Sequence, residues 1–115
     1  MTREVAHVDT KNRRRHERTA VTRPAKVYHA GSARYLSGYT RDVSAGGALL
    51  EVDSPRAIEV GDMIEVVVAW HDRALLSAAD LVKARVTRVL RTDTPRQYVG
   101  VAFESAGAVT ARRAA

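Results

Sequence analysis

The sequence predicts an all-β protein: a six-stranded antiparallel β-barrel with a flexible N-terminal arm and a C-terminal tail that forms a short helix or frays. Three observations support this prediction. Runs of β-branched and aromatic residues recur along the chain, turns rich in glycine, proline and aspartate separate them, and no long amphipathic helical pattern is present. Because closing a sheet removes its exposed edges, six such strands in one small domain favour a barrel.

The first three predicted strands occupy the N-terminal half of the chain, at residues 21–29, 34–43 and 47–52. Gly31 and Ser32 form the turn between the first two strands. Pro24 has no N–H to donate, so it belongs at the start or on an edge of its strand. Gly38 predicts a bulge or bend within the second strand.

The last three predicted strands lie at residues 63–70, 81–90 and 98–104, with turns at 53–55 and 92–96. Trp70 and Phe103 fall on the apolar faces of their strands, so we expect both to pack in the core. Val89 breaks the two-residue period of the fifth strand and predicts a bulge there.

The length of 115 residues fits one domain with one modest core. We expect a flexible lead at residues 1–12, a barrel domain with its arm at 13–104 and a short tail at 105–115. The chain has no cysteine, which excludes disulfides and thiolate metal sites. No apolar run approaches the roughly 20 residues of a membrane helix and no signal core follows Met1, so we expect a cytoplasmic protein without membrane insertion.

The formal net charge of +6 is unevenly distributed. Residues 11–18 carry five basic residues and one acidic residue, and Arg112 and Arg113 add two more positive charges. Residues 19–111 hold 11 basic and 10 acidic residues, so the body of the domain is nearly neutral. This distribution argues against a broad basic face for a polyanion and favours a compact anion or an acidic partner met by the arm.

A polar segment ends the second predicted strand: Arg41-Asp42-Val43-Ser44-Ala45-Gly46-Gly47. In an extended chain Asp42 and Ser44 lie on the same side, and the glycine pair lets the backbone turn and approach a ligand closely. An Asx or Ser turn between two strands is the alternative interpretation. Upstream, residues 13–18 form a basic cluster, for which a solvated run of charge is the alternative.

Taken together, these two segments resemble the PilZ domain, the bacterial receptor for cyclic di-GMP. The resemblance rests on Arg14-x-x-x-Arg18, followed 24 residues later by Asp42-x-Ser44-x-x-Gly47. It extends over roughly residues 13–104, and residues 98–103 look like the closing strand of that family. The resemblance implies a ligand site formed by Arg13, Arg14, Arg18, Asp42, Ser44, Gly46 and Gly47.

The chemistry of these residue types suits cyclic di-GMP. Arginine can donate two hydrogen bonds to guanine O6 and N7, can stack on the base and can bind phosphate. The Asp42 carboxylate can accept from guanine N1–H and N2–H₂. The resemblance further implies that Arg13, which directly precedes the first motif arginine, accompanies a mutually intercalated dimer of cyclic di-GMP. We expect the arm to close over the ligand and thereby change the contact with an unidentified downstream protein, with no metal and no cofactor.

Three other functions are weighed against this one. For an enzyme, Ser44, Asp42 and a histidine would have to form a triad, but no nucleophile-elbow pattern surrounds Ser44, so we expect no catalytic residues. A nearly neutral body with one tryptophan, one phenylalanine and four tyrosines argues against an RNA or single-stranded DNA module. A PilZ-like adaptor that binds protein and no nucleotide remains the main alternative.

Overall fold

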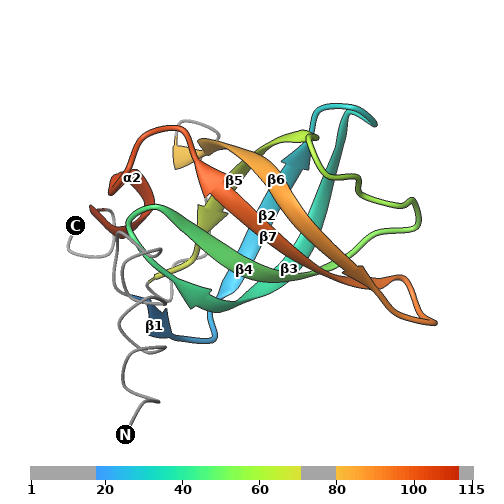
Figure 1. Ribbon diagram of the computed structural model, residues 1–115, viewed down its shortest axis with the longest axis horizontal. Coiled ribbons are helices and arrows are strands. Elements are labelled where there is room, and N and C mark those ends of the chain that lie inside the picture. The colour runs from blue at the N-terminus through green and yellow to red at the C-terminus, as the bar shows by residue number, and fades with distance from the viewer. Residues whose placement is uncertain (1–17, 71–79, 112–115) are drawn as a thin grey trace, which may run out of the picture.

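The computed structural model describes residues 18–70 and 80–111 of the chain (Figure 1). The described residues form seven β-strands and one short helical turn. In chain order these are β1 (Thr19–Ala20), β2 (Pro24–His29), β3 (Arg34–Val43), β4 (Gly47–Asp53), β5 (Met63–Val68), β6 (Val82–Arg91), β7 (Arg96–Phe103) and α2 (Ala108–Ala111).

The strands pair in the order β1-β3-β2-β5-β6-β7-β4, and a further pairing between β3 and β4 closes the sheet. Every pairing is antiparallel. Strands β2 to β7 therefore form a closed six-stranded barrel, and β1 is an extra strand added to β3 (Figure 1). This confirms the predicted fold class.

The first predicted strand, residues 21–29, is interrupted. Its C-terminal part is β2, whereas residues 21–23 separate β2 from β1. The cause is Thr40 on β3, which is fully buried. Its hydroxyl donates to the carbonyl of Val21 at 2.6 Å and accepts from the N–H of Arg23 at 2.9 Å. The side chain thus takes two of the backbone groups of this segment, while the Val21 N–H still donates to the Arg41 carbonyl and the Thr40 N–H to the Arg23 carbonyl.

Two β-bulges shape the barrel, and neither lies at the residue that the pattern indicated. In β3 the register with β4 shifts between Thr40 and Asp42, so Arg41 is the extra residue. In β6 the register with β7 shifts between Val86 and Arg88, so the extra residue is Thr87. Gly38 has a different role, because a Cβ there would lie 2.2 Å from the carbonyl oxygen of Glu51 on β4. The glycine allows β4 to approach β3 where the barrel closes.

The core fills the barrel, and each end is closed by a residue outside the strands. Ile58, in the loop between β4 and β5, is 1% exposed, and its N–H donates to Oε1 of the buried Gln97 at 3.0 Å. At the other end Val109 of α2 is 2% exposed and accepts a hydrogen bond from the indole of Trp70 at 3.0 Å. Phe103 is buried and Trp70 packs against the core, as the sequence pattern predicts.

The C-terminal tail forms a short helical turn at Ala108–Ala111, one of the two outcomes expected for it. It lies at the left end of the barrel in Figure 1. No helix within the described ranges is long and apolar enough to cross a membrane.

Candidate functional site

The bulge at Arg41 changes which side chains of β3 face outward. Thr40 and Val43 are both buried in the core, at 0% and 2% exposure. Since side chains of a regular strand alternate, two inward residues that are three positions apart leave two adjacent outward residues between them. Arg41 and Asp42 therefore project side by side from the outer surface of the barrel.

Arg18 reaches Asp42 from outside the barrel. Its Nη1 lies 2.8 Å from Oδ1 of Asp42, although the two residues are 24 positions apart. Strand β1 causes this contact, because it begins at Thr19 and pairs Thr19 with Val43 and Ala20 with Asp42. The side chains are 39% and 23% exposed. An ion pair at this exposure contributes about 0 to 1 kcal/mol to stability, so a ligand that separates the two groups would lose little.

A hollow of about 210 Å³ lies beside Arg18 on the outer surface. It follows a row of neighbours across four strands: Asp42 on β3 is opposite Leu49 on β4, Leu49 is opposite Gly100 on β7, and Gly100 is opposite Arg88 on β6. Because Gly100 has no side chain, the surface is depressed at Gly100, between Leu49 and Arg88. The hollow is lined by Arg18, Ala48, Leu49, Thr87, Arg88, Gly100 and Val101.

Ser44 belongs to the turn between β3 and β4. It is 7% exposed. Its hydroxyl accepts from the N–H groups of Gly46 and Gly47, each at 3.2 Å, and donates to the Gly47 carbonyl at 3.2 Å. Ser44 therefore forms the Ser turn that was the alternative interpretation of this segment. The Asp42 carboxylate is not part of that turn, because it contacts Arg18.

The two motif glycines also have packing roles. The Gly46 carbonyl accepts from the N–H of Phe103 at 2.9 Å and so joins the turn to β7. A Cβ on Gly47 would lie 2.2 Å from the carbonyl oxygen of Val101. Only glycine permits β4 and β7 to lie this close at the start of β4.

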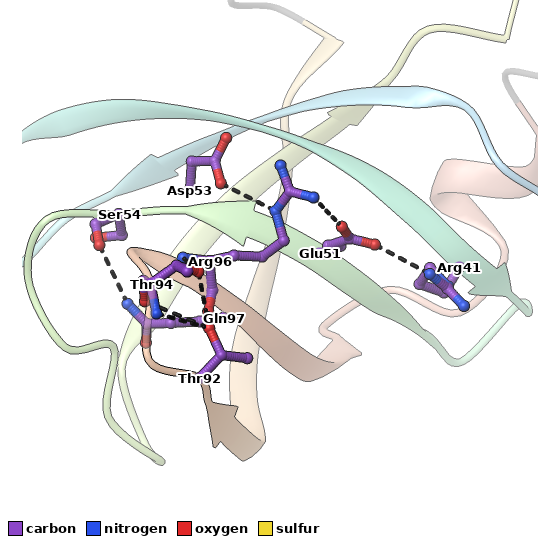
Figure 2. A network of polar contacts seen from close by, with 8 residues as sticks. All are labelled: Arg41, Glu51, Asp53, Ser54, Thr92, Thr94, Arg96 and Gln97. Atoms are coloured by element: carbon purple, nitrogen blue, oxygen red, sulfur yellow. Dashed lines mark hydrogen bonds and ion pairs between the residues drawn. The ribbon is translucent and has the colours of Figure 1, made fainter.

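A network of charged side chains continues from Arg41 along the same outer face (Figure 2). Nη1 of Arg41 lies 3.1 Å from Oε1 of Glu51, and Nη1 of Arg96 lies 2.7 Å from Oε2 of the same carboxylate. Nε of Arg96 also donates to Oδ1 of Asp53 at 3.2 Å. These carboxylates, Asp53 first, raise the pKa of the Arg96 guanidinium above its usual value, so it stays charged.

The family model of the PilZ domain matches residues 12–114, which is nearly the whole chain. The chain belongs to the PilZ domain family. This is a family that generally binds cyclic di-GMP and generally has no catalytic activity. The search of curated proteins found no significant match.

Two solved structures match this chain to different degrees. Bacillus subtilis MotI/DgrA, an inhibitor of motility, superposes with a TM-score of 0.61 at 11% identity over 81% of this chain. The match covers 43% of the MotI/DgrA chain, so this chain spans less than half the length of that protein. The PilZ domain of CeSA from a cellulose-synthesizing bacterium gives a TM-score of 0.45 at 19% identity, covering 76% of this chain and 79% of that domain.

Of the PilZ motif residues expected from the sequence, the structure brings Arg18 and Asp42 into contact and places Ser44, Gly46 and Gly47 in the adjoining turn. Arg13 and Arg14 lie outside the described residues. The sequence pattern missed Arg88, whose side chain has no hydrogen-bond or ion-pair partner within the described part of the chain and lines the hollow. Its only signal was the broken period near Val89, which marks the bulge beside Arg88.

A separate polar cluster lies around His29 of this PilZ barrel. Nδ1 of His29 is 2.8 Å from the Ser32 hydroxyl, and Nε2 is 2.8 Å from Oδ2 of Asp62. Burial raises the pKa of Asp62, but hydrogen bonds from the N–H of Glu59 and from His29 outweigh burial and hold that pKa below its usual value. The cluster joins the β2–β3 turn to the turn before β5. In the triad considered for an enzyme, a histidine would contact Ser44. His29 instead contacts Ser32 and Asp62, and the Ser44 hydroxyl bonds within its own turn.

Proposed function

We propose that this PilZ domain is a receptor for cyclic di-GMP. The ligand is held between the arm residues Arg13, Arg14 and Arg18 and the barrel residues Asp42, Ser44, Gly46 and Gly47. The observation that carries the proposal is the 2.8 Å contact between the guanidinium of Arg18 and the carboxylate of Asp42 beside the outer hollow. Two motif residues that are remote in sequence are thus presented together at a surface where a ligand can reach both.

Guanine offers a complementary partner to each of these two groups. Its O6 and N7 accept hydrogen bonds from a guanidinium, and its N1–H and N2–H₂ donate to a carboxylate. A bound guanine therefore replaces one partly exposed ion pair by two sets of charge-assisted hydrogen bonds, which contribute roughly 1.5 to 3 kcal/mol each before the cost of ordering the arm. This balance allows about micromolar, reversible binding.

Arg13, Arg14 and Arg88 extend the positive side of the proposed site. Arg13 supports binding of cyclic di-GMP as an intercalated dimer, because an additional guanidinium can stack on the second molecule. Arg88 lines the hollow opposite Arg18 and adds a further guanidinium for phosphate or base. Closure of the arm over the ligand repositions residues 1–12, and a downstream protein partner reads that change.

Isothermal titration of cyclic di-GMP into the purified protein at near-physiological salt tests the proposal. Arg14→Ala is the test variant, and GTP is the control ligand. Arg34→Ala is the matched control variant. Arg34 is an exposed arginine at the start of β3, where it lies opposite His29 and away from Asp42. We expect saturable binding near two ligands per domain that Arg14→Ala abolishes and Arg34→Ala keeps. No binding to the wild-type protein would refute the receptor function and favour a protein adaptor. Salt-sensitive oligonucleotide binding that Asp42→Ala leaves unchanged would favour a nucleic-acid module.

A further inference from the structure

A second row of side chains crosses the outer face of the barrel next to the proposed site. Tyr39 on β3 is opposite Glu51 on β4, Glu51 is opposite Tyr98 on β7, and Tyr98 is opposite Leu90 on β6. Tyr39 and Leu90 are 50% and 65% exposed. Glu51 lies two residues from Leu49 along β4, and Tyr98 lies two residues from Gly100 along β7, so this row is roughly 7 Å from the row that forms the hollow. One dinucleotide ligand can span that distance.

Arg41 connects the two rows. The bulge places it beside Asp42, and its guanidinium carbon lies 6.0 Å from the centre of the Tyr98 ring. The side chain is 53% exposed. Within the described residues its hydrogen bonding is limited to one contact, from Nη1 to Glu51, although a guanidinium carries five N–H donors. Most of its donors are therefore available to a ligand.

Glu51 allows Arg41 to move away at low cost. Its side chain is only 13% exposed, and a buried carboxylate that lost its sole partner would be strongly destabilising. However, Arg96 contacts the other oxygen of Glu51 at 2.7 Å, from the side opposite Arg41 (Figure 2). When Arg41 turns toward a ligand, Glu51 keeps its shorter ion pair.

We propose that Arg41 and Tyr98 form a second guanine subsite on this face, which binds a base of the second cyclic di-GMP molecule. The inference rests on the receptor function proposed above. Arg41 donates two hydrogen bonds to O6 and N7 of the base, and the Tyr98 ring provides an aromatic surface for stacking. Adenine carries an amino group in place of O6, so this subsite rejects cyclic di-AMP.

Calorimetric titration of three variants tests the subsite. Arg41→Ala removes the proposed contact, and Arg41→Lys keeps the charge but not the planar pair of donors. Arg34→Ala is the matched control, because it removes an exposed arginine of the same strand that lies opposite His29 and leaves both arginines on Glu51 in place. We expect Arg41→Ala and Arg41→Lys either to bind the second ligand at least about tenfold more weakly or to bind one ligand only, whereas Arg34→Ala stays within about twofold of wild type.

The outcomes separate this inference from the function on which it rests. Wild-type binding of cyclic di-GMP with unchanged affinity and stoichiometry in Arg41→Ala overturns the subsite and leaves the receptor function standing. Equal loss in Arg34→Ala also overturns it, because the effect would then not be specific to Arg41. Absence of binding to the wild-type protein overturns the receptor function and the subsite together. Thermal unfolding of each variant confirms that it is folded.

Discussion

Gly47 and Gly100 form a matched pair of glycines in paired strands, and we predict that replacement by alanine destabilises the domain strongly at Gly47 and little at Gly100. A Cβ on Gly47 would lie 2.2 Å from the carbonyl oxygen of Val101 and 3.3 Å from its carbonyl carbon. Both are backbone atoms of β7, so the strand itself must move. At Gly100 the nearest atom would be Cβ of Arg88 at 3.5 Å, which is an ordinary van der Waals contact.

The expected magnitude follows from these distances. An ordinary contact between a methyl group and an oxygen is more than 1 Å longer than the gap at Gly47, so β4 and β7 must separate and weaken their hydrogen bonds. Overpacking of this kind costs typically 1 to 3 kcal/mol, and we expect Gly47→Ala to lie at or above the upper end, about 3 kcal/mol. For a domain of this size the loss lowers Tm by roughly 12 to 24 °C.

Urea and thermal unfolding of the ligand-free protein measure this effect, with circular dichroism as the signal. Gly100→Ala should unfold within about 1 kcal/mol of wild type, since alanine also has less conformational entropy to lose than glycine. It fills the floor of the hollow, so it should weaken cyclic di-GMP binding in a fully folded protein. A Gly47→Ala variant as stable as the wild type would refute the packing argument and return Gly47 to a role in ligand contact alone.

Three further predictions concern single side chains. Asp42→Ala should change the free energy of unfolding by no more than about 1 kcal/mol, because its ion pair with Arg18 is partly exposed, but should abolish binding of cyclic di-GMP in the titration. Thr40→Val should destabilise the domain by roughly 1 to 3 kcal/mol in urea, because it leaves the partly buried N–H of Arg23 without its Thr40 acceptor. The folded pKa of Asp62 lies below the ordinary 3.8, so its contribution to stability is full above about pH 4 and is lost as pH falls through the folded pKa. The stability difference between the wild type and Asp62→Asn, measured in urea from pH 7 to pH 3, should therefore shrink below pH 4, and a constant difference would contradict this origin.

Sequence patterns located the strands well, because alternation and turn residues act over a few neighbouring positions. They did not predict the interruption at residues 21–23, which depends on the hydroxyl of Thr40 from another strand. They also placed both bulges at the wrong residue. A bulge is fixed by how two strands pair, and one strand alone does not contain that information.

The same limit applies to the candidate site. The structure brings Arg18 and Asp42, which the motif assigns to one ligand site, into direct contact, and the sequence analysis did not predict that contact. Arg41 was missed because strict alternation assigns it to the side opposite Asp42, and only the bulge brings both outward. Arg88 was missed for a related reason, since it lies directly after the bulge at Thr87.

The pairing of β1 with β3 has a consequence for how strongly the motif arginines can cooperate. Because Thr19 is fixed opposite Val43, Arg14 is joined to the barrel by only five residues. Five residues span at most about 17 Å, so the length of the chain alone confines Arg14 to a volume of that radius around Thr19. A group confined to that volume has an effective concentration on the order of 10 to 100 mM. Once Arg18 and Asp42 hold a ligand, Arg14 therefore meets it as an intramolecular partner, and lengthening the segment between Arg14 and Thr19 should weaken binding without removing a single contact.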